Sequence, residues 1–462
     1  MTAAPDIVPT TGLSARGAES GAAMFRLSLL GAATIALTLT IPFALRMGGD
    51  HAYMALAIAT GLVAVTAACV AERMSGLRAF WLIIAVAVLL RGVLLFTEPL
   101  LSSDIYRYVW DGRVQAAGIN PYRYFPAHEA LAPLRDGEIY PNVNRADYAV
   151  TIYPPVAQMF YFLTTRLGES VTVMKFALLA CEAGMAVIIL LLLRQIGRPP
   201  TRIVAYAWHP LPMWEIANNG HIDGLMIALM MLGLWLALSG RPLRGAVAVA
   251  LAALAKPFAV LALPAIWRRW DWKMPLVVLA VGALSYAPYL SVGTDVLGFL
   301  TRGYLNEEHL DTGSDAWPLA AIRYFTGPFH GDFVIYLAIS ALIIGAMALR
   351  AADREPRTSG TALADVNRLL LVFLLLLSPN YPWYFLALTP FVALVGGAPV
   401  WAATLGALLL QEEVAWDAQT PILIRKSILY GMVLAACAYA AWKDRKRISA
   451  AGRLSDERHP AR

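Results

Sequence analysis

Residues 79–96 read AFWLIIAVAVLLRGVLLF, an almost unbroken run of apolar side chains interrupted by one arginine, Arg91. About 20 apolar residues in a helix span the hydrocarbon core of a bilayer. Each run of this kind therefore predicts a membrane-spanning helix, and the repetition predicts an all-α polytopic membrane protein. Runs of this or nearly this length recur at 27–45, 52–71, 171–193, 225–238, 275–290, 333–349 and 422–442.

The composition supports the same class. Hydrophobic residues make up 59% of the 462 positions and charged residues only 15%, whereas a soluble domain carries about a quarter charged residues. Cys69, Cys181 and Cys437 lie inside apolar runs without pairing or ligand spacing, so they indicate neither a disulfide framework nor a metal site. The net charge of +6 comes from Lys and Arg in short loops and does not indicate a nucleic-acid partner.

The distribution of Lys and Arg predicts the orientation, because basic loops resist translocation and stay in the cytoplasm. The protein is expected in the inner (plasma) membrane, with both termini on the cytoplasmic side and about 12–14 transmembrane helices between them. We expect a disordered cytoplasmic tail at 1–25, a single transmembrane domain at 26–443 and a basic cytoplasmic tail at 444–462. The segments expected outside are 97–150, 209–223, 292–331, 378–383 and 411–420.

Three segments contain prolines that argue against simple spans. If 153–167 crossed the bilayer, the basic cluster at Arg194 would lie outside, so we expect a re-entrant or interfacial helix there. Segments 245–266 and 369–395 carry Pro near their middle, and each is expected to turn near the outer surface. Irregular backbone at that depth is tolerated where it lines a cavity.

The longest hydrophilic stretch, 97–150, is expected to contain a helix that begins after Ser103 as N-cap and ends before Gly118. On this helix Asp104 and Asp111 lie seven residues apart and share a face, with Arg107 near it. An Asp can take the proton of an acceptor hydroxyl, and guanidinium groups can hold a departing phosphate. The alternative is an amphipathic helix whose charges only face water.

The string SDIYRYVWDGR at 103–113, followed by GINPY at 118–122 and IYPP at 152–155, resembles the first extracytoplasmic loop of GT-C glycosyltransferases. It is similar to glycosyltransferase family 87 and to polyprenyl-phosphate-mannose-dependent mannosyltransferases. The resemblance implies a GT-C membrane enzyme that moves a hexose, mannose foremost, from a polyprenyl phosphate to a glycan or lipid hydroxyl at the outer face. It implies inversion at the donor carbon, with Asp104 as catalytic carboxylate. Many relatives pair two acidic residues there, whereas this chain has Ser103 before Asp104.

Four basic side chains are candidates to bind the donor phosphate. Lys256 interrupts an apolar run, and a charge within a span is costly and functional by default, although a lysine can also snorkel to the surface. Arg323 lies in the second outer loop, at 292–331, as a second candidate or as a surface arginine. Arg107 and Arg113 complete the set. Arg91 is expected either to pair with an acidic group or to be structural.

A second group of polar residues is expected to bind sugar or acceptor hydroxyls. For His221 and Asp223, metal binding is the alternative, but two ligands at this spacing are a weak signal, so neither a metal nor a cofactor is expected. For Asn380 and Tyr384, the alternative is interfacial anchoring. Glu412, Glu413 and Asp417 are expected to form a solvated outer rim. The full candidate set is Asp111, Asn218, His221, Asp223, Asn380 and Tyr384.

The chain contains no Walker or dinucleotide motif, which favours a lipid-linked donor over a nucleotide sugar. A transporter or flippase of lipid-linked sugars is the leading alternative function, and a noncatalytic scaffold is a second. Transporters place polar groups at the bilayer midplane. In this chain they gather toward one face, which favours the transferase.

Overall fold

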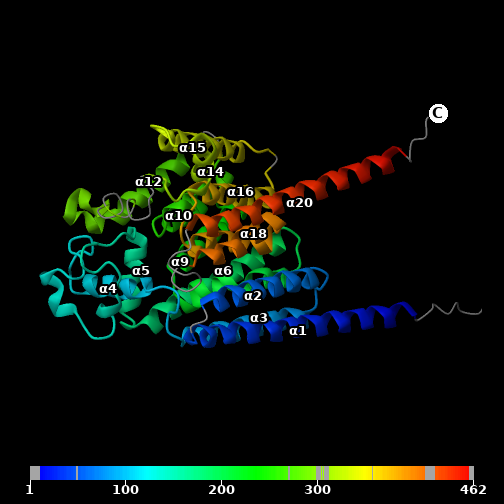
Figure 1. Cartoon of the computed structure of the whole chain (residues 1–462), viewed down its shortest axis with the longest axis horizontal. Helices are drawn as coiled ribbons and strands as arrows, with labels where there is room; N and C mark the ends of the chain where they lie inside the picture. Colours follow the sequence, from blue (N-terminus) through cyan, green and yellow to red (C-terminus); the bar gives the residue numbers. More distant parts are fainter. Residues whose placement is uncertain are drawn as a thin grey trace, which may run out of the picture.

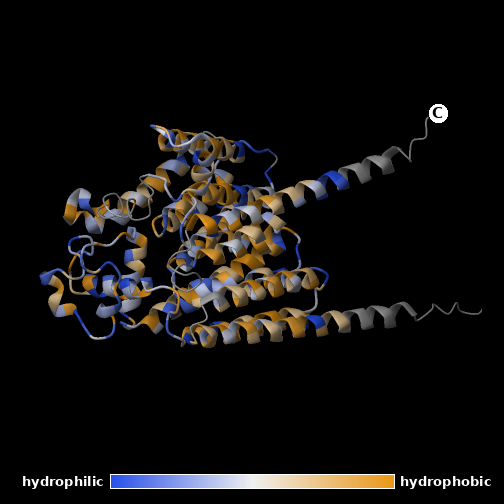
Figure 2. Cartoon of the chain, viewed as in Figure 1, coloured by the Kyte–Doolittle hydropathy of each residue, from blue (hydrophilic) through white to orange (hydrophobic). Residues whose placement is uncertain are grey.

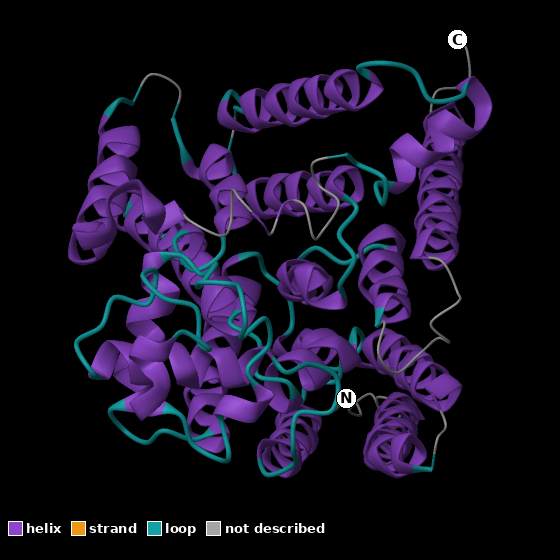
Figure 3. Ribbon diagram, turned by 60° about the vertical axis from the view of Figure 1, so that its left-hand side comes forward, coloured by secondary structure: helices purple, strands orange, loops and turns teal. Residues whose placement is uncertain are grey.

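The computed structural model describes residues 11–47, 50–268, 271–297, 312–355, 357–411 and 422–456, together with positions 303 and 305. Within these ranges all regular structure is helical, as Figure 3 shows, so the predicted all-α class is confirmed. Glu412, Glu413 and Asp417, the expected outer rim, lie outside the described residues.

Eight helices in the described ranges are long and apolar enough to cross a membrane, which confirms the polytopic class. A helix pair bent by 118°, Pro210–Asn218 with Asp223–Leu238, makes a ninth candidate. Four further apolar helices in the described ranges are shorter and contain prolines: Pro242–Ala253, Pro257–Ile266, Pro382–Leu394 and Ala398–Leu410. The eight long helices are α1 (Thr11–Arg46), α2 (Asp50–Ala71), α3 (Leu77–Leu95), α6 (Val171–Gln195), α12 (Lys273–Tyr286, continued to Leu297), α15 (Asp332–Ala352), α16 (Ser359–Leu377) and α20 (Ile422–Asp456).

The loop 97–150 and the chain termini lie at opposite ends of the molecule. In Figure 1, α1 and α20 extend toward the right, whereas α4 (Asp104–Ala116) and α5 (Pro155–Thr165) lie at the left end. Hydrophilic residues gather around α4 in Figure 2, beyond the apolar helices of the body. This arrangement agrees with an even number of passages. Which end faces the cytoplasm stays a prediction.

Both long terminal helices extend into the expected tails. Helix α1 begins at Thr11, so most of the stretch 1–25 that was expected to be disordered is helical. Alanine, which is frequent there, has the highest helix propensity and lets the spanning helix continue. Helix α20 likewise runs through 444–456. Residues 1–10 and 457–462 lie outside the described part of the chain.

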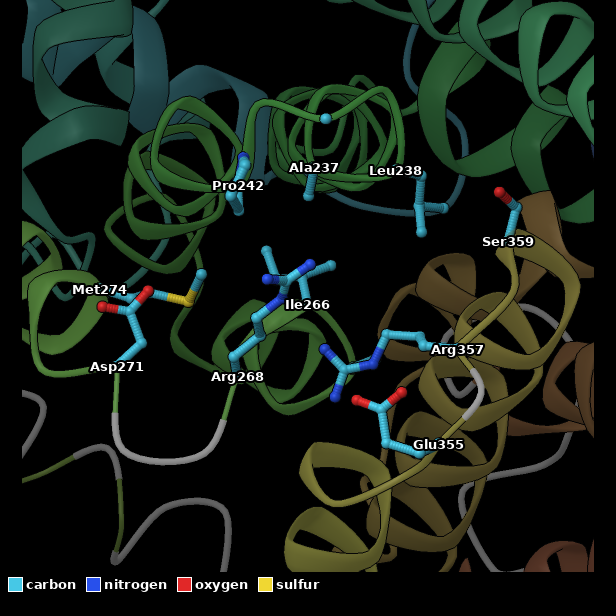
Figure 4. A pocket seen from close by; sticks show the side chains of 12 residues that line it. Ala237, Leu238, Pro242, Ile266, Arg268, Asp271, Met274, Glu355, Arg357 and Ser359 are labelled. Atoms are coloured by element: carbon cyan, nitrogen blue, oxygen red, sulfur yellow. The ribbon is translucent and has the colours of Figure 1, made fainter.

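The segment around Lys256 turns back on itself, as its proline predicted. Helix α10 (Pro242–Ala253) leads to Lys256, and the chain then returns through η5 (Pro257–Ala262) and α11 (Leu263–Ile266). A cavity of about 550 Å³ is lined by Pro242 at the start of the first arm and by Ile266 at the end of the second (Figure 4). Both arms therefore meet at the same end of the molecule.

The second proline break has the same form. Helix α16 ends at Ser378, whose φ of 51° reverses the chain, and η8 (Pro382–Leu388) and α17 (Thr389–Leu394) return. At the end of this return, the Arg202 side chain donates to the Ala393 carbonyl at 3.0 Å and to Glu72, just beyond α2, at 2.6 Å. The end of the return is thus joined through Arg202 of η3 (Pro200–Ile203) to the turn after α2.

Helices α9 (Asp223–Leu238) and α10 approach so closely that their backbones touch. A Cβ atom added at Gly233 would lie 2.7 Å from the Gly245 carbonyl oxygen and 2.5 Å from the Val249 side chain. Small residues at such contacts are typical of membrane helix pairs. This contact helps to place two candidate site residues, because Asp223 begins α9 and Lys256 follows α10.

Arg91 forms a buried ion pair, the first of the two alternatives expected for it. Its guanidinium lies 2.8 Å from Glu182 of α6 and donates to the Ala207 carbonyl at 2.7 Å. The Tyr206 hydroxyl also donates to Glu182 at 2.7 Å. These contacts join α3, α6 and α7 (Val204–Ala207) inside the apolar body.

Gly233→Ala is expected to destabilise the protein by about 1–3 kcal/mol, because the added methyl meets a fixed backbone carbonyl. The measurement is the thermal unfolding midpoint in detergent. The matched control is Gly282→Ala in α12, where no atom lies within 4 Å of the added Cβ. The control should unfold at or above the wild-type temperature, and an equal loss in both variants would contradict close packing as the cause.

Cysteine labelling tests the orientation. In a chain without its three native cysteines, Ala130→Cys in the outer loop and Asp444→Cys in α20 both place an exposed thiol. A membrane-impermeant maleimide should label the first in intact cells and the second only after permeabilisation. The reverse order would show that the loop 97–150 faces the cytoplasm.

Candidate active site

Helix α4 presents Asp104 at its first turn. Ser103 occupies the N-cap position, but its side chain makes no capping bond; instead the Asp104 amide donates to the Ser102 hydroxyl at 3.3 Å. The Asp104 side chain is 17% exposed. It is therefore fixed in place yet reachable, which a general base requires.

Two donors orient the Asp104 carboxylate. The Asn144 amide donates to Oδ1 at 2.6 Å, and the Tyr153 hydroxyl donates to Oδ2 at 3.2 Å. Burial, with a smaller effect from Asp104, raises the pKa of Tyr153 well above its usual value. Tyr153 therefore keeps its proton at neutral pH and remains a hydrogen-bond donor to the carboxylate.

A buried histidine lies beside this carboxylate. His221 Nδ1 is 3.8 Å from Asp104 Oδ2, and Nε2 is 3.2 Å from Glu215 Oε2. The imidazole ring stacks on Trp383 with centroids 4.3 Å apart. The ring is thus held between two carboxylates and against an indole.

An irregular stretch of backbone gathers these residues. The chain runs through the π-helix η4 (Met213–Asn218), turns at Gly220 with φ of 69°, and restarts as α9. π-Helical turns occur frequently at functional sites. A Cβ at Gly220 would lie 2.3 Å from the Ile105 side chain, so only glycine lets this turn pack on α4.

Lys256 reaches the site from the turn between α10 and η5. Its ammonium lies 2.6 Å from Asp223 Oδ2 and 4.9 Å from the centre of the Tyr384 ring. The Lys256 side chain is 14% exposed, whereas Asp223 is fully buried. Three predicted site residues, Lys256, Asp223 and Tyr384, are thereby brought together.

Asn218 holds the start of the outer loop. Its side-chain oxygen accepts from the Leu100 amide at 3.0 Å, and its nitrogen donates to the Thr97 hydroxyl at 2.8 Å and to the Glu98 carbonyl at 2.9 Å. These bonds engage both ends of its amide. Its predicted contact with sugar would need one of them to be exchanged.

Arg107 and Asp111 form a buried pair with each other at 2.8 Å. Arg107 also donates to the Ala149 carbonyl at 3.1 Å, and the Gln158 amide donates to Asp111 at 2.9 Å. These contacts fasten α4 to α5 and to the preceding loop. Because both side chains are buried, α4 is not merely a solvated amphipathic helix.

Arg113 also has protein carboxylates as partners. It lies 2.7 Å from Asp136 and 2.8 Å from Glu169. Although partial burial opposes the effect, hydrogen bonds from Arg113 and from backbone amides lower the pKa of Asp136 to about 2. Asp136 therefore stays ionised at neutral pH, and Arg113 links the outer loop to Glu169 before α6.

Two other predicted residues belong to a different part of the molecule. Arg323 of α14 (Trp317–Thr326) pairs with Asp332 at 2.7 Å, beside a small separate apolar cluster. The Asn380 side-chain oxygen Oδ1 accepts a hydrogen bond from Lys426 of α20 at 2.7 Å. The structure thus brings together Asp104, Asn218, His221, Asp223, Lys256 and Tyr384, and it places Arg107, Asp111, Arg113, Arg323 and Asn380 in other contacts.

Three residues of the site were not recognised from the sequence. Glu215 stands between apolar runs, and this intramembrane charge is the signal that could have singled it out. Tyr153 lies in the quoted IYPP string but had no role assigned. Asn144 gives no local signal, because its partner Asp104 is 40 residues away. In the described ranges, no three His, Cys, Asp or Glu side chains form a group suited to a metal ion.

Comparison with known proteins bears on this site. Residues 21–271 match the family described as alpha-(1→6)-mannopyranosyltransferase, N-terminal domain. The chain is 26% identical over 332 residues to alpha-(1→6)-mannopyranosyltransferase A of Mycobacterium tuberculosis, which covers 65% of this chain and 63% of that relative. The chain thus spans less than two thirds of the relative's length. No solved structure matches.

The family match includes Asp104, His221 and Lys256 and covers more than half of the 462 residues. It agrees with the resemblance carried by the string at 103–113. This chain belongs to the alpha-(1→6)-mannopyranosyltransferase family.

Proposed function

We propose that this protein transfers mannose from a polyprenyl monophosphate to a mannoside hydroxyl, forming an α-(1→6) linkage at the outer face of the plasma membrane. Family membership supports mannosyl transfer. The observation that carries the proposal is the Asp104 carboxylate, which is partly exposed and oriented by two hydrogen-bond donors.

The proposed reaction is a single displacement. Asp104 removes the proton of the acceptor hydroxyl as its oxygen attacks the anomeric carbon and the phosphate departs. Inversion in one step gives an α product from a β-linked donor. Asn144 and Tyr153 each use one Asp104 oxygen atom as acceptor, which leaves lone pairs for the incoming hydroxyl.

Lys256 is proposed to neutralise the departing phosphate. Its ammonium stands at the turn between α10 and η5, where a phosphate anchored by its lipid tail would approach from the membrane. Asp223 holds the ammonium in position and compensates its charge before the donor arrives. Charge-assisted contacts of this kind stabilise a bound phosphate by about 1.5–3 kcal/mol.

The site also bears on the transporter alternative. A transport path needs polar groups along the membrane depth, with a substrate site near the midplane. Here the base candidate belongs to a loop helix, and the partners of Asp104 come from that loop and from the broken helix beside it. This placement favours a reaction at one face of the membrane over transport across it.

Asp104→Asn is expected to reduce mannosyl transfer by a factor of roughly 100 to 10,000, because the amide cannot accept the proton. The assay is transfer of radiolabelled mannose from polyprenyl-phosphate mannose to an alkyl α-mannoside. The control Asp147→Asn changes an exposed carboxylate in the same loop and should stay within a few-fold of wild type. Near-wild-type transfer by Asp104→Asn would remove Asp104 from the mechanism.

Lys256→Met/Asp223→Asn is expected to raise the donor KM about tenfold or more relative to Asp223→Asn alone, which keeps the ammonium. The double variant is needed because Lys256→Met by itself leaves a buried carboxylate unpaired, which costs about 3–5 kcal/mol in stability. Lys256→Arg should retain part of the donor affinity. Equal donor KM values in the double and single variants would show that Lys256 serves only to balance Asp223.

A further inference from the structure

The imidazole of His221 lies between Asp104 and a second, deeper carboxylate, that of Glu215. The two nitrogen–oxygen distances are 3.8 Å to Asp104 and 3.2 Å to Glu215. Stacking on Trp383 fixes the plane of the ring. Each nitrogen therefore faces one carboxylate, although neither has a hydrogen-bond partner within the described residues.

Glu215 is placed where a carboxylate needs compensation. It is fully buried on η4, and within the described residues its Oε1 atom has no hydrogen-bond partner. Its Oε2 atom accepts from the Asn219 amide at 3.0 Å. A buried carboxylate without a cation is unfavourable, so Glu215 is placed to stabilise the positive charge that the imidazole acquires when it accepts a proton.

We propose that His221 receives the proton that Asp104 takes from the acceptor, and that Glu215 is a positioning residue that holds the resulting imidazolium. This inference rests on the proposed transfer reaction. His221 carries its resting proton on Nε2, toward Glu215, and presents an unprotonated Nδ1 to Asp104. A movement of about 1 Å brings Asp104 Oδ2 within hydrogen-bond distance of Nδ1.

The proton and electron pairs balance along this path. The acceptor oxygen forms a bond to the anomeric carbon while its O–H bond breaks, and the proton passes to Asp104. The bond between the anomeric carbon and the phosphate oxygen breaks with its electron pair staying on phosphate. Asp104 then gives the proton to Nδ1, and the imidazolium held by Glu215 releases it to water after the product leaves.

The charges around His221 make this assignment testable. Asp104 from α4 and Glu215 from η4 face its nitrogens, and Asp223 of α9 is neutralised by Lys256 at 2.6 Å. Tyr153 contributes a neutral hydroxyl, since burial raises the pKa of that group. Lys175 of α6 packs under the Gly220 turn and donates to the Thr97 carbonyl at 2.5 Å.

The first test compares the pH dependence of kcat in the full-length protein in nanodiscs, with polyprenyl-phosphate mannose as donor and an alkyl α-mannoside as acceptor. His221→Gln should lower kcat about 10- to 100-fold, leave the donor KM within about threefold and remove the acid limb that His221 contributes. Glu215→Gln should keep this limb but move it to lower pH, because the imidazolium loses its counter-charge.

His209→Gln is the matched control. His209 is also a fully buried histidine stacked on a tryptophan, Trp401, but its Nε2 atom bonds to the Thr404 hydroxyl at 2.9 Å instead of a carboxylate. This variant should leave the acid limb in place. An acid limb unchanged in both His221→Gln and Glu215→Gln would overturn the proposal, as would a raised donor KM with unchanged kcat in His221→Gln.

The second test does not depend on activity. In donor-free protein labelled with ¹⁵N-histidine, the signal lost in His221→Gln should report a proton on Nε2, and its titration midpoint should fall in Glu215→Gln. A titration midpoint that is the same in wild type and in Glu215→Gln would overturn the pairing of His221 with Glu215. If wild-type protein transfers no mannose from the lipid donor, the proposed function fails instead, so the two failures are distinguishable.

Discussion

A charge inside an apolar helical body needs a partner, and this constraint decides which helices of the protein must meet. Arg91 requires Glu182, Arg107 requires Asp111, and Lys256 requires Asp223. Removing one member of such a buried pair costs several kcal/mol, because the other remains uncompensated. The first pair joins α3 to α6, the second lies within α4, and the third joins α9 to the turn after α10. The position of the site follows from these attachments.

Two opposite features of the backbone act together around the site. The close contact between Gly233 and Gly245 makes α9 and α10 a rigid pair. The π-helix and the turn at Gly220, by contrast, break regular structure so that His221 lies beside Asp104 and Glu215 lies beside His221. The close helix packing fixes the position of Lys256, and the irregular backbone places His221 in the site. A continuous helix through 210–238 would have pointed these side chains in different directions, since successive residues of a helix are rotated by about 100°.

The sequence predicted what depends on local pattern. Hydropathy predicted the all-α class, the signals at Ser103 and Gly118 predicted helix α4, and Pro257 predicted the turn beside Lys256. The partners of Arg113 and Arg323 were missed, because ion pairs depend on side chains brought together by folding, such as Glu169, 56 residues from Arg113. The lengths of the individual spans were not predicted, because a count of apolar residues does not register how far a proline shortens a helix. The site roles themselves stay predictions.

The hairpin of α10, η5 and α11 has a consequence for how the chain is made. The insertion machinery recognises segments of about 20 apolar residues, and a lysine at the centre of one opposes insertion by about 2.5–3.5 kcal/mol. The first arm has 12 residues and the second is 6 followed by 4, with Lys256 between them. Neither arm is a substrate for insertion on its own. The hairpin therefore depends on α9, which precedes it in the chain and supplies both the carboxylate for Lys256 and the glycine surface for α10.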